Sequence, residues 1–253
     1  MKIVVAIKSV PDTTTQIRVA TDAPHTIDLA GVKFITSPYD EMALEQALRL
    51  REEHGGEVVA ITLGGAQGGA VLRGALTLGA DRAVHLEAES PTGLELDGFQ
   101  TASALANFLR TETFDLLLCG RLAIDDQSAQ VGTLTARLLD RPVVNEVTGI
   151  EATEDAFRFQ RTVDGRGQVV ECEAPAVATA EKGLAEPRRP SMKSIMAAKK
   201  KTLETVTAQL PSATLEVIAL EPPPPRQPGR IVGEGVEAVE ELVQLLEQEA
   251  KVL

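Results

Sequence analysis

A polar loop bounded by two glycines holds the residues of this chain that are best placed to bind an anion. Its sequence is Gly120-Arg-Leu-Ala-Ile-Asp-Asp-Gln-Ser-Ala-Gln-Val-Gly132, and it follows the apolar run 114–119, which is typical of a buried strand. Residues 133–139 then predict a helix. The first N–H groups of a helix lack intrahelical partners, and its dipole favours negative charge there. The loop therefore predicts a binding site for a nucleotide phosphate.

Asp125 and Asp126 lie in this loop, although carboxylates repel a phosphate. Three roles are open to them: bonding to ribose hydroxyls, capping of backbone N–H groups, or action through a counter-cation. Residue type alone favours capping.

Three more segments are expected beside this loop, because ligands bind at the carboxyl ends of the strands in open parallel sheets. They are residues 6–8, 37–40 and 63–67. Backbone groups of Ala6 and Leu63 are expected to hold an adenine edge. Each segment also has a plain structural explanation: Ser37-Pro38 suits a helix cap followed by the first helical position, and Gly64-Gly65 suits a tight turn.

Motifs for bond-breaking chemistry are missing. The chain has no GxGxxG fingerprint, no GxxxxGK[ST] loop and no Ser-His-Asp or Cys-His arrangement. Its 3 histidines are scattered, so no metal site is predicted. Glu41 and His85 are better explained as surface and packed residues. The chain is therefore expected to be a carrier or binding subunit rather than an enzyme.

The elements that position these residues alternate between strand and helix. Together they predict an α/β fold with a mostly parallel twisted sheet and helices on both faces. Strands are predicted at 3–7, 57–63, 82–86, 114–119, 176–180 and 215–220, and helices at 37–54, 66–78, 94–110 and 133–139. A small hairpin is predicted at 16–20 and 26–29, and an antiparallel meander at 143–151, 156–162 and 168–172.

The bulk composition is that of an ordinary globular protein, with 43% apolar and 25% charged residues. A net charge of −12 argues against binding to nucleic acid. The 2 cysteines make no disulfide framework, the N-terminus is strand-like rather than a signal peptide, and no apolar run is long enough to span a bilayer. These features favour the cytoplasm.

A proline-rich stretch, residues 221–230, separates two parts of the chain. Residues 1–221 are expected to form a nucleotide-binding α/β domain. Residues 222–253 are expected to form an extended C-terminal arm, a stiff linker followed by an amphipathic helix. Such a helix needs an apolar surface to cover it, either on its own domain or on another chain.

Several motifs together resemble one family, the β subunit of electron transfer flavoprotein. The resemblance covers nearly the whole chain. It rests on Val5-Ala-Ile-Lys8 with Ile17-Arg18, Ser37-Pro-Tyr-Asp-Glu41, Gly79-Ala-Asp-Arg82, the loop 120–132, Glu186-Pro-Arg188 and Ser194-Ile-Met-Ala-Ala-Lys-Lys-Lys201.

The resemblance implies a heterodimer with an α subunit, one FAD bound mainly by α, and a structural AMP bound by β. Tyr39 matches a family aromatic that approaches the flavin ring. The cofactor-binding residues carried over by motif are Ala6, Ser37, Pro38, Tyr39, Asp40, Leu63, Gly120, Arg121, Leu122, Ala123, Ile124, Asp125, Asp126, Gln127, Ser128, Ala129, Gln130 and Val131.

The resemblance also implies a recognition loop, residues 182–201, that docks on partners. The partners of the family are dehydrogenases, notably acyl-CoA dehydrogenases, and a membrane quinone oxidoreductase. Met192 stands where the family places a leucine anchor, and the lysine run is expected to steer acidic partners. The docking residues carried over are Met192, Ile195, Met196, Lys199, Lys200 and Lys201. The arm 222–253 resembles the family's arm onto the partner subunit.

Two departures from the family pattern bear on the ligand. Ser37 replaces the usual Asn, and Gln127 replaces the usual third Asp of the loop. Electron-bifurcating relatives hold a second FAD in this pocket and commonly have glycine at the second Asp. Asp126 is present here, which favours AMP. Two alternatives stay open: a bifurcating β subunit with a second FAD, and a stand-alone ATP-binding α/β protein.

Overall fold

A computed structural model describes residues 1–21, 23–88, 96–153, 155–225 and 228–253 of the chain. These residues divide into two units, Met1–Leu220 and Glu221–Leu253.

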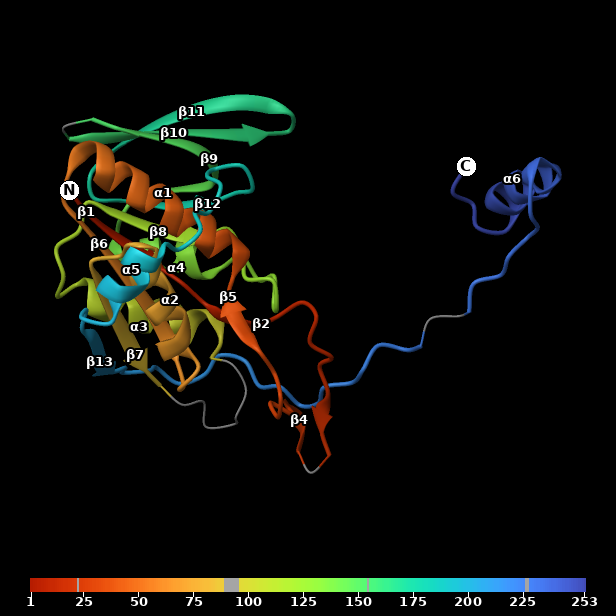
Figure 1. Cartoon of the computed structure of the whole chain (residues 1–253), viewed down its shortest axis with the longest axis horizontal. Helices are drawn as coiled ribbons and strands as arrows, with labels where there is room; N and C mark the ends of the chain where they lie inside the picture. Colours follow the sequence, from red (N-terminus) through yellow and green to blue (C-terminus); the bar gives the residue numbers. More distant parts are fainter. Residues whose placement is uncertain (22, 89–95, 154, 226–227) are drawn as a thin grey trace. The chain divides into compact units, whose positions relative to one another are not determined.

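The first unit is built on a 9-stranded sheet with the order β11-β10-β9-β12-β8-β1-β6-β7-β13 (Figure 1). All neighbours pair in parallel except β9-β10 and β10-β11, which are antiparallel. The strands are β1 (Lys2–Ala6), β6 (Glu57–Gly64), β7 (Arg82–Glu87), β8 (Leu116–Gly120), β9 (Val143–Ala152), β10 (Ala156–Val163), β11 (Arg166–Glu173), β12 (Ala176–Ala180) and β13 (Leu203–Thr207).

Helices cover both faces of this sheet, so the predicted fold class is confirmed. The helices of the first unit are α1 (Pro38–His54), α2 (Gly68–Leu78), α3 (Gly98–Leu109), α4 (Val131–Leu139) and α5 (Met192–Ala198). On β1, Ile3 and Val5 belong to the core under α1 and α2, while Val4 belongs to the core under α3 and α4. Strands buried on both faces are continuously apolar, which explains why the strand runs were recognisable in the sequence.

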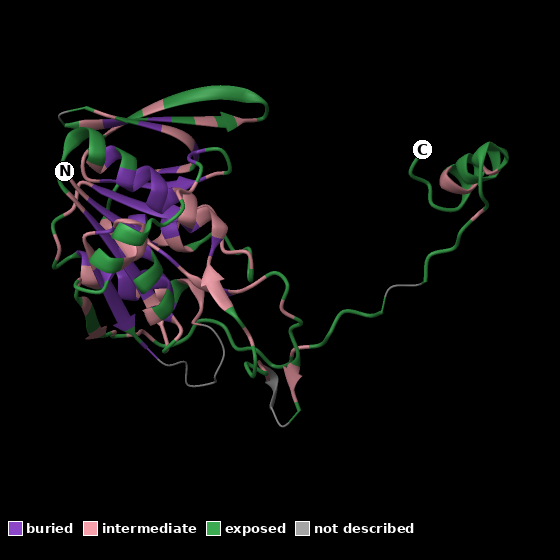
Figure 2. Ribbon diagram, in the orientation of Figure 1, coloured by how far each residue is buried: buried purple, intermediate pink, exposed green. Residues whose placement is uncertain are grey.

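Burial is concentrated in the central strands and on the inner faces of the helices (Figure 2). The meander is more exposed toward its outer edge, where β11 has no buried residue. This difference follows from the layers, because α1 and α4 contact β12 and β8 while β11 is an edge strand.

The segment of the chain between β1 and α1 forms two small antiparallel pairs of strands. One joins β2 (Ser9–Pro11) to β5 (Phe34–Thr36), and the other joins β3 (Val19–Ala20) to β4 (Ala23–Ile27). The second pair is the predicted hairpin.

The predicted strand at 215–220 is wrong. Backbone N–H groups of Thr214 and Leu215 donate to the Asp97 carboxylate at 2.6 and 3.3 Å, which holds the start of this segment on the N-cap of α3 instead of in a ladder. The edge of the sheet opposite β11 is formed by β13, which pairs with β7 and was not predicted.

The helix predicted from 94 begins later. Asp97 forms a capping box with Gln100, which fixes the first turn of α3 at Gly98. Residues 94 and 95 lie outside the described residues.

The second unit contains a short 3₁₀ turn, η1 (Val236–Ala238), followed by helix α6 (Val239–Gln248). Within the unit, Arg230 pairs with Glu249 at 2.6 Å. The helix was predicted from its apolar spacing, and none of its residues is buried.

Candidate functional site

The carboxyl ends of β1, β6 and β8 lie side by side, because β1 is between the other two strands. Ala6 is in register with Ile61 on β6 and with Cys119 on β8. The residues that follow these positions, Lys8 and Gly120 among them, therefore emerge at one edge of the sheet. This is the edge where the sequence predicted a nucleotide site.

The N-terminus of α1 is fastened to this edge by Asp40. Its carboxylate accepts hydrogen bonds from the backbone N–H of Lys8 at 2.8 Å and from that of Gly120 at 2.7 Å. The N–H of Ser37 donates to the carbonyl of Lys8 at 3.0 Å. Residues 37–40 and Gly120, which are far apart in the sequence, are thus in direct contact.

Gly120 is needed for this close approach. A Cβ atom at this position would lie 2.8 Å from the Cβ of Tyr39 and would also meet the Asp40 carboxylate. The sequence assigned this glycine to a turn near phosphate. The structure shows why a side chain would not fit at this position: α1 packs tightly against the end of β8.

Burial raises the pKa of the Asp40 carboxyl to about 7, because the interior disfavours the charged form. The N–H groups of Lys8 and Gly120 and the Lys8 ammonium all act in the opposite direction, and the Asp125 carboxylate adds to the rise. The site therefore holds a carboxyl that titrates near neutral pH.

Lys8 is the counter-cation of the acidic pair in the loop. Its Nζ lies 2.8 Å from Asp125 and 2.9 Å from Asp126. The N–H of Ser128 donates to Asp126 at 2.9 Å, and the N–H of Asp126 donates to Asp125 at 2.9 Å. Of the roles that the sequence left open for Asp125 and Asp126, the structure shows two: they accept hydrogen bonds from backbone N–H groups, and they pair with a cation. Lys8 lies in the segment 6–8 that was expected at this edge, but it was not singled out as a binding residue. A lysine directly after one strand, opposite two aspartates after another strand, is a usable signal.

The loop reaches α4 through an unusual backbone. Gln127 and Ala129 adopt positive φ values of 52° and 54°, which L-residues rarely do. Gln130 precedes α4 without capping it through its side chain. The first N–H groups of α4, starting at Val131, therefore have no side-chain cap from Gln130, and their role in binding an anion stays a prediction.

Ser37 was considered either as a helix cap or as part of the nucleotide site, and the structure places it at the start of α1. It occupies the N-cap position, but its side chain makes no capping hydrogen bond. Its hydroxyl is buried and has no hydrogen-bond partner among the described residues. Pro38 begins the helix as expected.

Arg121 is bound to protein carboxylates. Its guanidinium donates to Glu181 at 2.5 Å and lies 3.5 Å from Glu146. The hydrogen bond and charge of Glu181 raise the pKa of Arg121. The arginine thereby links the end of β8 to the end of β12 and to β9.

Ala6, Tyr39 and Leu63 are half-buried at this edge, as are Leu122, Ala123 and Ile124. The remaining loop residues, 125–130, are exposed. Cys119 precedes Gly120 on β8. Burial raises the pKa of its thiol, which makes the thiol unreactive.

The six predicted docking residues lie together on α5 and the turn after it. Met192 and Met196, four residues apart on one helix, are 77% and 60% exposed. Lys199 and Lys200 are exposed, and Ile195 is half-buried. Lys201 differs, because its amine donates to the carbonyl of Ala80 at 2.5 Å.

Within the ranges that the structure describes, no three His, Cys, Asp or Glu side chains are grouped so that they could hold a metal ion. Among the described residues, no helix has both the length and the apolar character that crossing a membrane requires.

The electron transfer flavoprotein domain model matches residues 25–211 of the chain. The chain is 38% identical to the electron transfer flavoprotein subunit beta of Bacillus subtilis, over 88% of this chain and 90% of the relative. It is 36% identical to the corresponding subunit of Sus scrofa, over 98% and 97%. It is also 36% identical to the subunit of Oryza sativa whose name includes the word mitochondrial, over the full length of both chains, 100% each.

Proposed function

The chain belongs to the electron transfer flavoprotein family as a β subunit, and we propose that it serves in a heterodimeric, FAD-containing electron carrier without catalytic residues of its own. The observation that carries this proposal is the similarity to β subunits along nearly the whole chain. The partner that completes the carrier is an electron transfer flavoprotein α subunit.

The carrier accepts electrons from dehydrogenases such as acyl-CoA dehydrogenases and passes them to a membrane quinone oxidoreductase. The support on this chain is the recognition loop, where Met192 and Met196 offer an adaptable apolar surface. Lys199 and Lys200 follow this apolar surface in the chain, and both are exposed. Although the chain has a net charge of −12, their amines make a local positive charge that would attract an acidic partner.

AMP is the nucleotide we assign to the edge of the sheet where residues 6–8, 37–40, 63 and 120–131 gather. Three features of the described residues fit an adenine nucleotide there. The N-terminus of α4 carries no side-chain cap, Lys8 pairs with the two aspartates and offsets part of the charge that would repel phosphate, and the buried Ser37 hydroxyl has no hydrogen-bond partner among the described residues. Buried polar groups are normally hydrogen-bonded, so a ligand that bonds to this hydroxyl satisfies it.

FAD supplies the electron-carrying chemistry when it is bound, mainly by the α subunit. The contribution of this chain is Tyr39, a half-buried aromatic in the first turn of α1. Its ring face suits packing against the flavin ring and excluding water from it. Gly120 and Asp40 hold this turn in place.

The C-terminal arm, residues 222–253, is proposed to dock on the α subunit, while residues 1–221 form the nucleotide-binding domain. Helix α6 supports this role because its apolar residues recur at helical spacing and none is buried. A short isolated helix is marginal in water, so docking of its apolar face would stabilise it.

The cytoplasm is the proposed location. Cys119 and Cys172 are both free thiols in the structure, which fits a reducing compartment.

Co-expression with the α subunit, followed by denaturation and mass identification of the released nucleotides, tests these proposals. One FAD and one AMP per heterodimer is the expected result. Two FAD molecules per heterodimer and no AMP would mean that a second flavin occupies this site, and would point to a bifurcating enzyme. A colourless, monomeric chain with exchangeable ATP would overturn the carrier function.

A further inference from the structure

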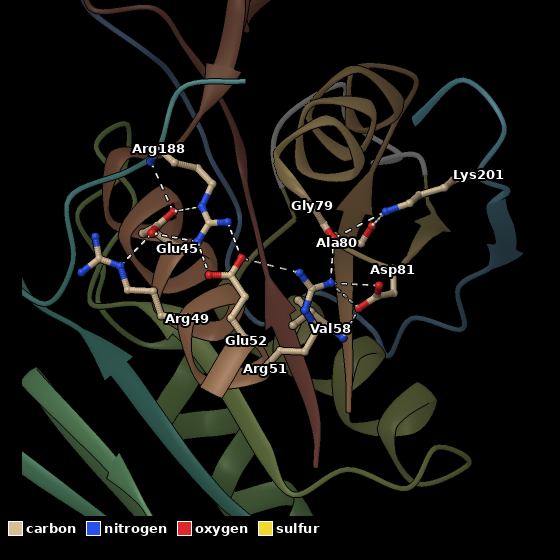
Figure 3. Close-up of polar contacts among 10 residues, drawn as sticks. All are labelled: Glu45, Arg49, Arg51, Glu52, Val58, Gly79, Ala80, Asp81, Arg188 and Lys201. Atoms are coloured by element: carbon tan, nitrogen blue, oxygen red, sulfur yellow. Dashed lines mark hydrogen bonds and ion pairs between the residues drawn. The ribbon is translucent and has the colours of Figure 1, made fainter. Parts of the chain in front are cut away.

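Within the recognition loop, two cationic side chains lie on either side of α5, Arg188 before the helix and Lys201 after it. Two motifs that the proposed function leaves without a role, Glu186-Pro-Arg188 and Gly79-Ala-Asp-Arg82, are linked in one polar network through residues of α1 (Figure 3). The contacts of this network indicate what both motifs do.

Arg188 is bound to two carboxylates of α1. Its Nε donates to Glu45 at 2.7 Å, its Nη1 donates to Glu52 at 2.5 Å, and its backbone N–H donates to Glu45 at 3.2 Å (Figure 3). Glu45 and Glu52 are seven residues apart, which is two helical turns, so both project from the same face of α1. A planar guanidinium fits such a pair, because its N–H donors point in fixed directions.

The Glu45 side chain is only 5% exposed, and it receives a second arginine. Burial raises the pKa of Glu45, but hydrogen bonds from Arg188 and Arg49 outweigh burial and lower it overall. The Nε of Arg49 donates to Glu45 at 2.7 Å, and its guanidinium also donates to the carbonyl of Glu186 at 3.1 Å. Residues 186–188 are thus tied to α1 by both backbone and side-chain atoms.

Lys201 forms the second attachment, at the end of α2. Its Nζ donates to the carbonyl of Ala80 at 2.5 Å and lies 3.5 Å from that of Gly79 (Figure 3). Arg73 on α2 donates to the carbonyl of Lys201 at 3.2 Å. Carbonyls at the C-terminus of a helix carry partial negative charge, which makes them good acceptors for an ammonium group.

Arg51 joins the two attachments. It lies 3.9 Å from Glu52, which binds Arg188, and it donates to the carbonyl of Gly79 at 3.1 Å, which Lys201 also approaches. Arg51 also pairs with Asp81 at 2.9 Å, and Asp81 accepts the N–H of Val58 on β6 at 2.9 Å. Both ends of the segment 188–201 are therefore fixed to one network that reaches the central sheet.

Helix α5 packs against α2 but buries little of its own surface. Ala198 is its one buried residue, and it packs in the core near α2. A helix of 7 residues is too short to be stable by itself. Its conformation therefore depends on the two attachments at its ends and on its own capping box, Ser191 with Ser194.

We propose that Arg188 and Lys201 are positioning residues, which hold α5 with Met192 and Met196 outward for a dehydrogenase partner. This inference rests on the proposed function, in which the recognition loop docks on that partner. Neither side chain has to touch the partner, since each acts by fixing the segment between them.

Arg188→Gln and Lys201→Gln test the proposal in the full complex with the α subunit. Arg188→Lys keeps the positive charge but removes the planar guanidinium with its several N–H donors. Arg158→Gln is the matched control, because Arg158 also bridges two carboxylates, Glu151 and Glu171, but on the meander. Hydrogen exchange of the α5 amides and the KM and kcat of electron transfer from an acyl-CoA dehydrogenase are measured for each variant.

Both glutamine variants are expected to exchange the α5 amides about ten-fold faster than the control. They are also expected to raise KM about three- to ten-fold with kcat and flavin content unchanged, and Arg188→Lys should lie between. Unchanged exchange in both variants overturns the anchoring. Faster exchange with unchanged KM overturns the positioning role where Met192→Glu does raise KM, and it overturns the docking function where Met192→Glu leaves KM unchanged as well.

Discussion

The Oδ1 atom of Asp40, in the first turn of α1, accepts a hydrogen bond from the backbone N–H of Gly120, at the end of β8, at 2.7 Å. The two residues are 80 positions apart in the sequence. This contact sets the position of Tyr39 and of the loop after Gly120 together, and the first two predictions depend on it.

Asp40→Asn is expected to lower the free energy of unfolding of the complex by about 1–3 kcal/mol, because the amide group turns a donor toward an N–H that needs an acceptor. The pH dependence identifies the cause. The pKa of Asp40 is about 7 when folded against 3.8 as its ordinary value, so the folded state binds more protons between these limits. Its contribution to stability therefore falls as pH rises from about 4 to about 7. Denaturant unfolding across this range should show the slope in the wild type and not in Asp40→Asn; equal slopes would refute the assignment.

Gly120→Ala should destabilise the protein by about 1–3 kcal/mol, since its Cβ would be 2.8 Å from the Cβ of Tyr39. Gly74→Ala is the control. It lies within α2 with open space around its Cβ, and alanine there should stabilise by about 0.5–1 kcal/mol. Thermal unfolding of both variants measures the difference. A tolerated Gly120→Ala would mean that α1 does not need this close approach.

Lys8→Gln should weaken AMP retention about ten-fold, or about 1.4 kcal/mol, because Asp125 and Asp126 would then repel the phosphate without compensation. Lys33→Gln removes an ion pair with Asp12 in another part of the chain and serves as the control. AMP released from each purified heterodimer is measured by mass. Equal AMP content in the two variants would show that Lys8 does not serve the nucleotide.

Met192→Glu is expected to raise the KM for a dehydrogenase partner about ten-fold or more while flavin content stays unchanged, because a charge would be forced into an apolar contact. Val169→Glu, on β11, places the same charge at a residue that is 64% exposed, and it should leave KM unchanged. Loss of flavin in the Met192 variant would refute the location of the docking surface.

Leu242→Glu should weaken association with the α subunit about ten-fold or more, since it puts a charge on the apolar face of α6. Gln244→Glu adds the same charge on the same helix outside the apolar spacing and should bind normally. Titration of each variant with the α chain measures the affinity. Normal binding by Leu242→Glu would show that this face does not contact α.

Local patterns in the sequence were sufficient for most of the fold. The continuous apolar strands, the helix from Pro38 to His54 and the meander were all predicted, because strands buried on two faces and amphipathic helices leave periodic signals within a few residues. The family was also evident from motifs along the chain. Errors arose where a distant side chain decides the backbone, as at the predicted strand 215–220, where the Asp97 carboxylate accepts the N–H groups of Thr214 and Leu215 and holds the start of the segment at the N-cap of α3.

The sequence by itself therefore determined the alternation of elements, the edge of the sheet where the polar loops gather, and the acidic pair at Asp125 and Asp126. Only the tertiary structure decided that Lys8 pairs with both of these aspartates, that Gly120 admits α1 and that Arg188 pairs with Glu45 and Glu52 on α1. The reason is physical. Strands and helices are specified by neighbouring residues, whereas ion pairs and close approaches join residues that only the packed sheet brings together.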